Sequence, residues 1–162
     1  MLGRLYEDQD CSAARALELI GERWSILILR DAMFRGFTRF SEFQHALQVA
    51  PNILAKRLEN FVASGLMERQ DGQRSEHHEY HLTGKGQELK PIVMALSACG
   101  AKWTSPGRMI YSHANCGGQV ELQTRCMVCD ATPNLSDVVV TPRCRAAQPI
   151  DASSTISNRR RR

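Results

Sequence analysis

Two amphipathic segments joined by a very short connection constrain the fold of this 162-residue chain more than any other feature. In the first segment, Phe40, Phe43 and Leu47 recur at helical spacing and predict one apolar face. Thr38 or Ser41 is expected to cap that helix at its N-terminus. Only Gln-Val-Ala at positions 48–50 separates it from the next segment, so a tight turn is predicted.

The second segment is predicted to form a helix from Pro51 to about Ser64. Proline suits the first turn of a helix, where its missing N–H would have no partner. Gly65 is expected to end the helix as a C′ glycine. The apolar side of this helix carries Leu54, Leu58, Phe61 and Val62. Two helices with inward apolar faces and a short turn between them are typical of a helix-turn-helix.

A polar-tipped hairpin follows directly. Residues 66–70 and 79–82 alternate as two strands, and the polar stretch between them includes Arg74, His77 and His78. The predicted fold class is therefore α+β, mainly α: a winged helix-turn-helix, with any other small α+β domain as the alternative. The two histidines are expected to be ordinary exposed loop residues, with a pH-sensing role as the alternative.

Helices are also predicted on both sides of this unit. Upstream, Gly21 separates two short helices that carry Leu17, Ile20, Trp24, Leu27 and Ile28. Downstream, Thr83 is a good N-cap for a long helix over 84–103, in which Pro91 either bends the helix or occupies an early turn. Its apolar stripe predicts a homodimer contact, with core packing as the alternative, and consists of Leu89, Ile92, Val93, Leu96, Cys99, Gly100 and Trp103. Cys99 is interpreted as a small core residue.

The charge is distributed unevenly. The chain has a net charge of +4, and the excess lies beyond residue 105. Half of the basic residues there are Arg159 to Arg162, in a stretch expected to be a solvated tail. Between Arg35 and Arg57, however, the sequence contains four basic residues and only one acidic residue, within an otherwise neutral domain. This local cluster favours contact with nucleic acid more than the total charge does.

Neither a membrane span nor a secretory h-region is predicted, so the chain is expected in the cytoplasm. Thiols stay reduced there, and the six cysteines are therefore interpreted first as metal ligands, buried thiols or redox sensors.

A Cys/His pattern begins beyond Pro106. His113 and Cys116, then Cys126 and Cys129, have the H-x2-C and C-x2-C spacing of two zinc-ribbon knuckles, with nine residues between the pairs. A structural Zn²⁺ is predicted; unmetallated thiols or a Cys126–Cys129 redox pair are the alternatives, and Cys144 could replace a ligand. The expected organisation is a DNA-binding and dimerisation domain, a zinc-ribbon-like segment and a flexible tail, over residues 1–105, 106–135 and 136–162 respectively.

Taken in order, several blocks of the sequence resemble the HxlR family of winged-helix transcriptional regulators, a branch close to the MarR type. The resemblance spans about Cys11 to Trp103. The blocks that carry it are Cys-Ser-Ala-Ala-Arg-Ala-Leu-Glu-Leu-Ile-Gly-Glu-Arg-Trp (11–24), Ile-Leu-Ile-Leu-Arg-Asp (26–31), Gly-Phe-Thr-Arg-Phe-Ser-Glu-Phe (36–43), Leu-Ala-Lys-Arg-Leu (54–58), Ser-Gly-Leu (64–66) and Glu-Tyr-His-Leu-Thr-Gly-Lys-Gly (79–86).

The resemblance implies a homodimer that binds a pseudo-palindromic operator, and we expect a repressor. Some family members sense oxidants or electrophiles through a cysteine near the first helix, which suggests Cys11 as a redox sensor. A helix N-terminus stabilises a thiolate, whereas Asp8 and Asp10 oppose it; an ordinary semi-buried thiol is the alternative. Ala50 departs from the family, which often has a capping Ser or Thr at that position.

Candidate DNA contacts follow from the face opposite the apolar side of the helix from Pro51. Asn52 and Lys56 lie toward the N-terminal end, which enters the major groove, and are expected to contact base edges. Arg57 lies nearer the buried side and is expected to reach a phosphate or a neighbouring carboxylate. Arg39 is a candidate phosphate contact, and Arg74 on the wing is expected to meet the minor groove or backbone.

Three other functions are alternatives or additions to DNA binding. The main alternative is a small enzyme, such as a zinc hydrolase or a thiol oxidoreductase, but an enzyme is not expected, because the chain has no H-E-x-x-H, P-loop or Gly-x-Ser-x-Gly motif. A protein-binding module would use the zinc-ribbon-like segment and the apolar stripe. A sensor of a small molecule would have an apolar pocket between the dimer helix and the winged core, and is compatible with DNA binding.

Overall fold

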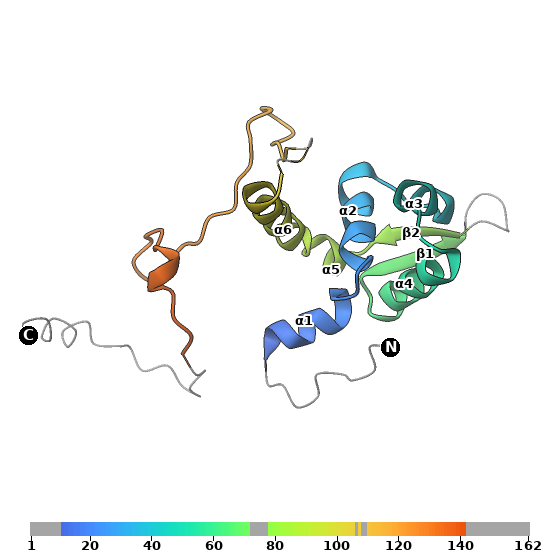
Figure 1. Ribbon diagram of the computed structural model, residues 1–162, viewed down its shortest axis with the longest axis horizontal. Coiled ribbons are helices and arrows are strands. Elements are labelled where there is room, and N and C mark those ends of the chain that lie inside the picture. Colours follow the sequence, from blue (N-terminus) through green and yellow to red (C-terminus); the bar gives the residue numbers. More distant parts are fainter. Residues whose placement is uncertain (1–10, 72–77, 106, 108–109, 142–162) are drawn as a thin grey trace, which may run out of the picture. The chain divides into compact units, whose positions relative to one another are not determined.

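A computed structural model describes residues 11–71, 78–105, 107 and 110–141 (Figure 1). Two compact units are found, one within Met1–Leu122 and the other within Gln123–Arg162. The boundary between them thus falls inside the segment 106–135. Along the chain the elements are α1 (Ser12–Ile20), α2 (Ser25–Arg35), α3 (Phe40–Leu47), α4 (Pro51–Ala63), β1 (Met67–Asp71), β2 (His78–Leu82), α5 (Gly84–Gln87), α6 (Lys90–Trp103) and the 3-10 turn η1 (Leu135–Asp137).

The predicted helix-turn-helix is confirmed as α3 and α4. Gln48 adopts a left-handed conformation with φ 50° and turns the chain between the two helices. Pro51 lies in the first turn of α4. Gly65 follows α4 with φ 70°, which a residue with a side chain rarely adopts.

The cap of α3 differs from the prediction. Arg39, not Thr38 or Ser41, is the N-cap residue. The Glu42 carboxylate accepts hydrogen bonds from the backbone N–H groups of Thr38 and Arg39, at 2.9 and 2.8 Å. The reason is that Thr38 is still part of the sheet edge: its carbonyl accepts the Tyr80 N–H at 2.7 Å. The cap is therefore the carboxylate of a residue within the helix, and not the hydroxyl of a residue that precedes the helix.

The wing is a two-stranded antiparallel sheet, in which Met67 pairs with Leu82 and Asp71 with His78. An isolated bridge between Arg39 and Glu79 adds the segment before α3 to the free edge of β2. Arg74 and His77, in the predicted tip, lie outside the described residues.

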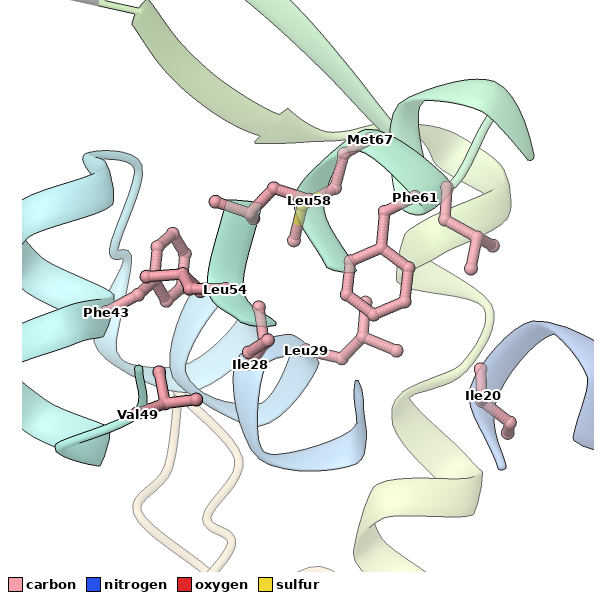
Figure 2. Close-up of a cluster of buried hydrophobic side chains, with 10 residues drawn as sticks. Ile20, Ile28, Leu29, Phe43, Val49, Leu54, Leu58, Phe61 and Met67 are labelled. Atoms are coloured by element: carbon pink, nitrogen blue, oxygen red, sulfur yellow. The ribbon is translucent and has the colours of Figure 1, made fainter. Parts of the chain in front are cut away.

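The core lies where α2, α3, α4 and β1 converge (Figure 2). Ile28 and Leu29 of α2 are fully buried, which puts α2 at the centre of the winged unit. Around them pack Phe43, Val49, Leu54, Leu58, Phe61, Leu66 and Met67. The apolar faces predicted for α3 and α4 are thus the ones that are buried.

The predicted single helix over 84–103 is wrong: it is two helices, α5 and α6. Pro91 lies in the first turn of α6, so the expected early-turn position is confirmed and a bend within one long helix is not found. Proline lacks the N–H that a continuous helix would need there. Thr83 is the N-cap of α5, and its side chain accepts a hydrogen bond from the Gly86 N–H.

Most of the α6 stripe is open in the single chain. Val93 is buried, but Ile92, Leu96 and Trp103 are 37%, 51% and 73% exposed. Cys99 is also exposed, so its interpretation as a core residue is wrong for the isolated chain. The stripe is exposed because only a narrow side of α6, which includes Val93, packs against the winged core. Among the described residues, no helix is both long enough and apolar enough to cross a bilayer.

Candidate nucleic-acid interface

The surface of α4 divides cleanly into an apolar and a polar side. Leu54, Leu58 and Phe61 are buried in the core, so the helix is held firmly along its length. The opposite side exposes Asn52, Lys56, Glu59 and Asn60. Asn52 and Lys56 lie in the N-terminal half, as the sequence predicted. This arrangement presents two polar side chains from a rigid helix, as reading of base edges requires.

Of the two partners expected for Arg57, a phosphate or a neighbouring carboxylate, the structure shows the carboxylate. Its side chain is only 16% exposed, and its Nη2 lies 3.0 Å from Glu22 Oε2, on the segment between α1 and α2. An arginine that is mostly buried and paired contributes little to a phosphate-binding surface. Its role in the fold is to tie α4 to the N-terminal part of the chain.

Arg39 stands at the junction of α3 and the wing. Its side chain is 62% exposed, and Nε donates to Glu79 Oε1 at 3.1 Å. The pair orients the guanidinium while leaving donors directed to solvent. Arg39 can therefore still donate to a phosphate. Its pair with Glu79 makes the local charge neutral instead of strongly positive.

Arg35, the fourth member of the basic cluster, also contacts other residues of the fold. Its guanidinium lies 4.3 Å from the centre of the Phe37 ring and 3.7 Å from Asp31 Oδ2. Asp31 is fully buried, and its Oδ2 has no hydrogen-bond partner within the described chain. Sequence reasoning missed this carboxylate. The signal was present, because an aspartate flanked by Arg30 and Arg35 interrupts an otherwise apolar helix.

Cys11 is exposed and is the N-cap residue of α1. Its carbonyl accepts the Arg15 N–H at 3.2 Å, so the thiol lies at the helix N-terminus as expected. Asp8 and Asp10, which were expected to oppose a thiolate there, lie outside the described residues. An exposed thiol at this position is open to oxidants.

Two short turns carry the predicted metal ligands, one in each compact unit. In the first, Gly117 N–H donates to His113 O at 2.8 Å, and His113 N–H donates to Gly118 O at 2.8 Å. His113 Nδ1 lies 3.2 Å from Cys116 Sγ. Gly117 has φ 71°.

The second turn repeats this backbone pattern. Asp130 N–H donates to Cys126 O at 3.0 Å, Cys126 N–H donates to Ala131 O at 2.9 Å, and Asp130 has φ 60°. Hydrogen bonds from the backbone N–H groups of Cys129 and Val128 and from the Cys129 thiol lower the pKa of Cys126. Within the described chain, no three His, Cys, Asp or Glu side chains are grouped so as to hold a metal ion. Cys144 lies outside that part.

A buried helix-turn-helix, a two-stranded wing and a polar exposed face on the second helix define a winged-helix DNA-binding protein. The HxlR-like helix-turn-helix family model matches residues 19–108, and the chain belongs to this family. The HTH-type transcriptional regulator Rv3095 of Mycobacterium tuberculosis, itself uncharacterized, is 34% identical over 135 residues, covering 81% of this chain and 85% of Rv3095.

Solved structures agree with this assignment. The crystal structure of PA1607, a candidate transcription factor, superposes with a TM-score of 0.74 at 36% identity, over 84% of this chain and 97% of PA1607. The reduced form of the redox regulator HypR gives a TM-score of 0.52 at 26% identity, over 57% of this chain and 92% of HypR. The protein is therefore a transcriptional regulator of the helix-turn-helix type, a class that binds DNA and catalyses no reaction.

Proposed function

We propose that the protein is a cytoplasmic, sequence-specific repressor that binds a pseudo-palindromic operator as a homodimer. The observation that carries the proposal is the exposure of Asn52 and Lys56 on the N-terminal half of α4, whose other side is locked into the core. A helix held in this way can enter the major groove without rearranging.

Each proposed contact has a chemical reason. The Asn52 amide can pair with adenine N6 and N7, and the Lys56 ammonium can donate to guanine O6 and N7. Arg39 contacts a phosphate and sets the position of α4 without reading sequence. Arg74, which lies outside the described residues, is the candidate for a contact with the adjacent minor groove or backbone. Arg57 supports the interface indirectly, through its pair with Glu22.

The dimer is proposed to form through α6. Ile92, Leu96 and Trp103 expose large apolar surfaces that a single chain leaves in water. Burial against the same stripe of a second copy removes that surface from water in both chains. Such a two-fold arrangement also presents two α4 helices to the two halves of a palindrome.

Fluorescence anisotropy on a duplex from the gene's own upstream region, with a scrambled duplex as control, tests the DNA-binding proposal. The wild type is expected to bind the upstream duplex at least ~10³-fold more tightly than the scrambled one. Lys56→Ala is expected to weaken specific binding by about 5- to 150-fold, the value of one good base contact.

Lys85→Ala is the matched control, because it also removes one exposed lysine. Lys85 Nζ donates to Ser64 O, at the opposite end of α4 from the proposed base contacts. This variant is expected to bind like the wild type. Equal losses in both variants, or equal binding of both duplexes, would mean that only charge attraction is at work.

Regulation by oxidation is proposed to act through Cys11, since its exposed thiol is accessible to an oxidant. Diamide is expected to change the operator affinity of the wild type and of Cys99→Ser, but not that of Cys11→Ser. A response in Cys11→Ser equal to that of the wild type refutes this part.

We also propose that the two Cys/His turns bind a structural Zn²⁺ through His113, Cys116, Cys126 and Cys129. Support comes from the spacing in the sequence and from the shared backbone pattern of the two turns. A structural zinc takes four nitrogen and sulfur ligands, the number that the two turns carry together. Elemental analysis is expected to find one zinc per chain in the wild type and in Cys99→Ser, and little in Cys126→Ser. Full zinc in Cys126→Ser overturns the assignment.

A further inference from the structure

We propose that Glu79 is a positioning residue for DNA recognition. It holds the Arg39 guanidinium in one orientation, so that Arg39 contacts a phosphate only when α4 is seated in the major groove of the operator. This role rests on the proposed DNA-binding function and adds a second side chain to the contact proposed for Arg39. The two residues belong to the two parts of the winged helix, since Glu79 is in β2 of the wing and Arg39 precedes α3. β2 and α3 lie side by side (Figure 1).

The backbone sets the two residues opposite each other. Arg39 and Glu79 form an antiparallel bridge, and beside it the Tyr80 N–H donates to the Thr38 carbonyl at 2.7 Å. Residues that are directly opposite in such a pairing have Cβ atoms about 5 Å apart, and opposite charges at these positions stabilise the pairing. The ion pair between Arg39 and Glu79 therefore follows from the way in which the wing is joined to the helix-turn-helix.

The Glu79 carboxylate has a neighbour on each side. Its Oε1 accepts from Arg39 Nε at 3.1 Å, and its Oε2 lies 3.4 Å from His81 Nε2. The Glu79 side chain is only 26% exposed, whereas that of Arg39 is 62% exposed. The second carboxylate near Arg39, that of Glu42, accepts the backbone N–H groups of Thr38 and Arg39. Glu79 is therefore the carboxylate that orients the guanidinium.

The orientation matters because a guanidinium donates through a rigid, planar fork. The bond to Glu79 uses Nε, so it fixes the direction in which the Nη groups of the exposed Arg39 side chain can donate. A phosphate in that direction binds without displacing Glu79, whereas a phosphate elsewhere requires the ion pair to break first. When α4 is not seated in the major groove, the phosphates do not occupy the favoured place. Glu79 therefore weakens non-specific binding more than it weakens operator binding.

The test compares Glu79→Gln with the wild type by fluorescence anisotropy on the upstream and scrambled duplexes. Glutamine keeps the shape of the side chain and removes its charge, which releases Arg39. The variant is expected to bind the scrambled duplex about five- to tenfold more tightly at about 0.1 M salt, the effect of one additional phosphate contact, with a salt slope steeper by about 0.9. Binding of the upstream duplex is expected to change less than about twofold. An unchanged ratio of the two affinities overturns the proposal.

Glu68→Gln is the matched control, because it removes the same charge from the same wing. Glu68 lies opposite His81 in the sheet, and its Oε1 accepts from the Gln70 amide at 2.7 Å instead of from an arginine. This variant is expected to bind both duplexes like the wild type. Equal effects of Glu68→Gln and Glu79→Gln would mean that only the net charge of the wing matters, and would overturn the proposal.

A double-mutant cycle shows whether Glu79 acts through Arg39. In a chain that already carries Arg39→Ala, the further change Glu79→Gln is expected to leave the affinity for either duplex unchanged. An effect of Glu79→Gln that persists without Arg39 would mean that the carboxylate acts through another group, and would overturn the proposal.

The orientation of Arg39 is measured separately, by NMR of the arginine Nε–H groups in the absence of DNA. The signal missing from Arg39→Ala identifies Arg39. Its exchange with water is expected to be slow in the wild type and in Glu68→Gln, and fast in Glu79→Gln. Equal exchange in the wild type and Glu79→Gln refutes the positioning role even if the wild type discriminates between the duplexes. Equal binding of both duplexes by the wild type, with the slow exchange intact, refutes the proposed function instead.

Discussion

Gly86 is the position at which a single methyl group is expected to cost most. It is buried in α5, and a Cβ atom there would lie 2.2 Å from the Leu66 carbonyl oxygen and 2.9 Å from Leu82 Cδ2. Ordinary carbon–oxygen contacts in proteins begin near ~3.3 Å, so the overlap is about 1 Å. The Leu66 carbonyl cannot easily retreat, because it accepts the N–H of Thr83 at 3.1 Å and the Thr83 hydroxyl at 3.2 Å.

Gly86→Ala is therefore expected to lower the free energy of unfolding by about 3 kcal/mol, the upper part of the usual overpacking range. The assay is urea unfolding followed by circular dichroism at a fixed protein concentration, since dimerisation would otherwise alter the apparent stability. The melting temperature is expected to fall by roughly 10 °C or more.

Gly84→Ala is the matched control in the same short helix. No atom lies within 4 Å of a Cβ placed there. This variant is expected to be as stable as the wild type, or more stable by up to about 1 kcal/mol, because alanine restricts the unfolded chain. A Gly86→Ala variant within about 0.5 kcal/mol of the Gly84→Ala variant would refute the steric argument.

Two further predictions concern ionised groups. The backbone amides of Arg39 and Thr38 lower the pKa of Glu42, so its contribution to stability is complete above its ordinary pKa of 4.5 and is lost as the pH falls through the lowered value. Glu42→Gln is expected to cost about 1 kcal/mol at pH 7 and to lose less stability in acid; identical pH profiles from urea titrations would contradict this. A double-mutant cycle on Arg57 and Glu22 is expected to give a coupling free energy of about 1 kcal/mol, and a value near zero would show that the pair does not stabilise α4.

The helix-turn-helix could be predicted because its signals are local. Pro51 and Gly65 mark the two ends of α4 by backbone chemistry, and the 3.6-residue period of its leucines identifies the buried side. The same period identified Asn52 and Lys56 as exposed. None of these inferences needs knowledge of which distant element packs against the helix.

Errors arose where a distant residue competed with a local signal. Thr38 has the chemistry of an N-cap, but the chain is held extended there because the Thr38 carbonyl accepts the Tyr80 N–H. Cys99 lies within the apolar stripe of α6, yet it is exposed, because no other segment that the structure describes covers it. Periodicity identifies a face of a helix but does not reveal what lies against that face.

By itself, then, the sequence determined the winged-helix class, the boundaries of α4 and the polar side of α4, because spacing and turn chemistry act over a few residues. Only the tertiary structure decided that Arg57 is paired with Glu22, that Gly86 lies against the Leu66 carbonyl, and that Asp31 is buried with one oxygen that has no hydrogen-bond partner among the described residues. Each of these depends on segments remote in the chain meeting in space, and burial alone turns an ordinary side chain into one whose pairing matters.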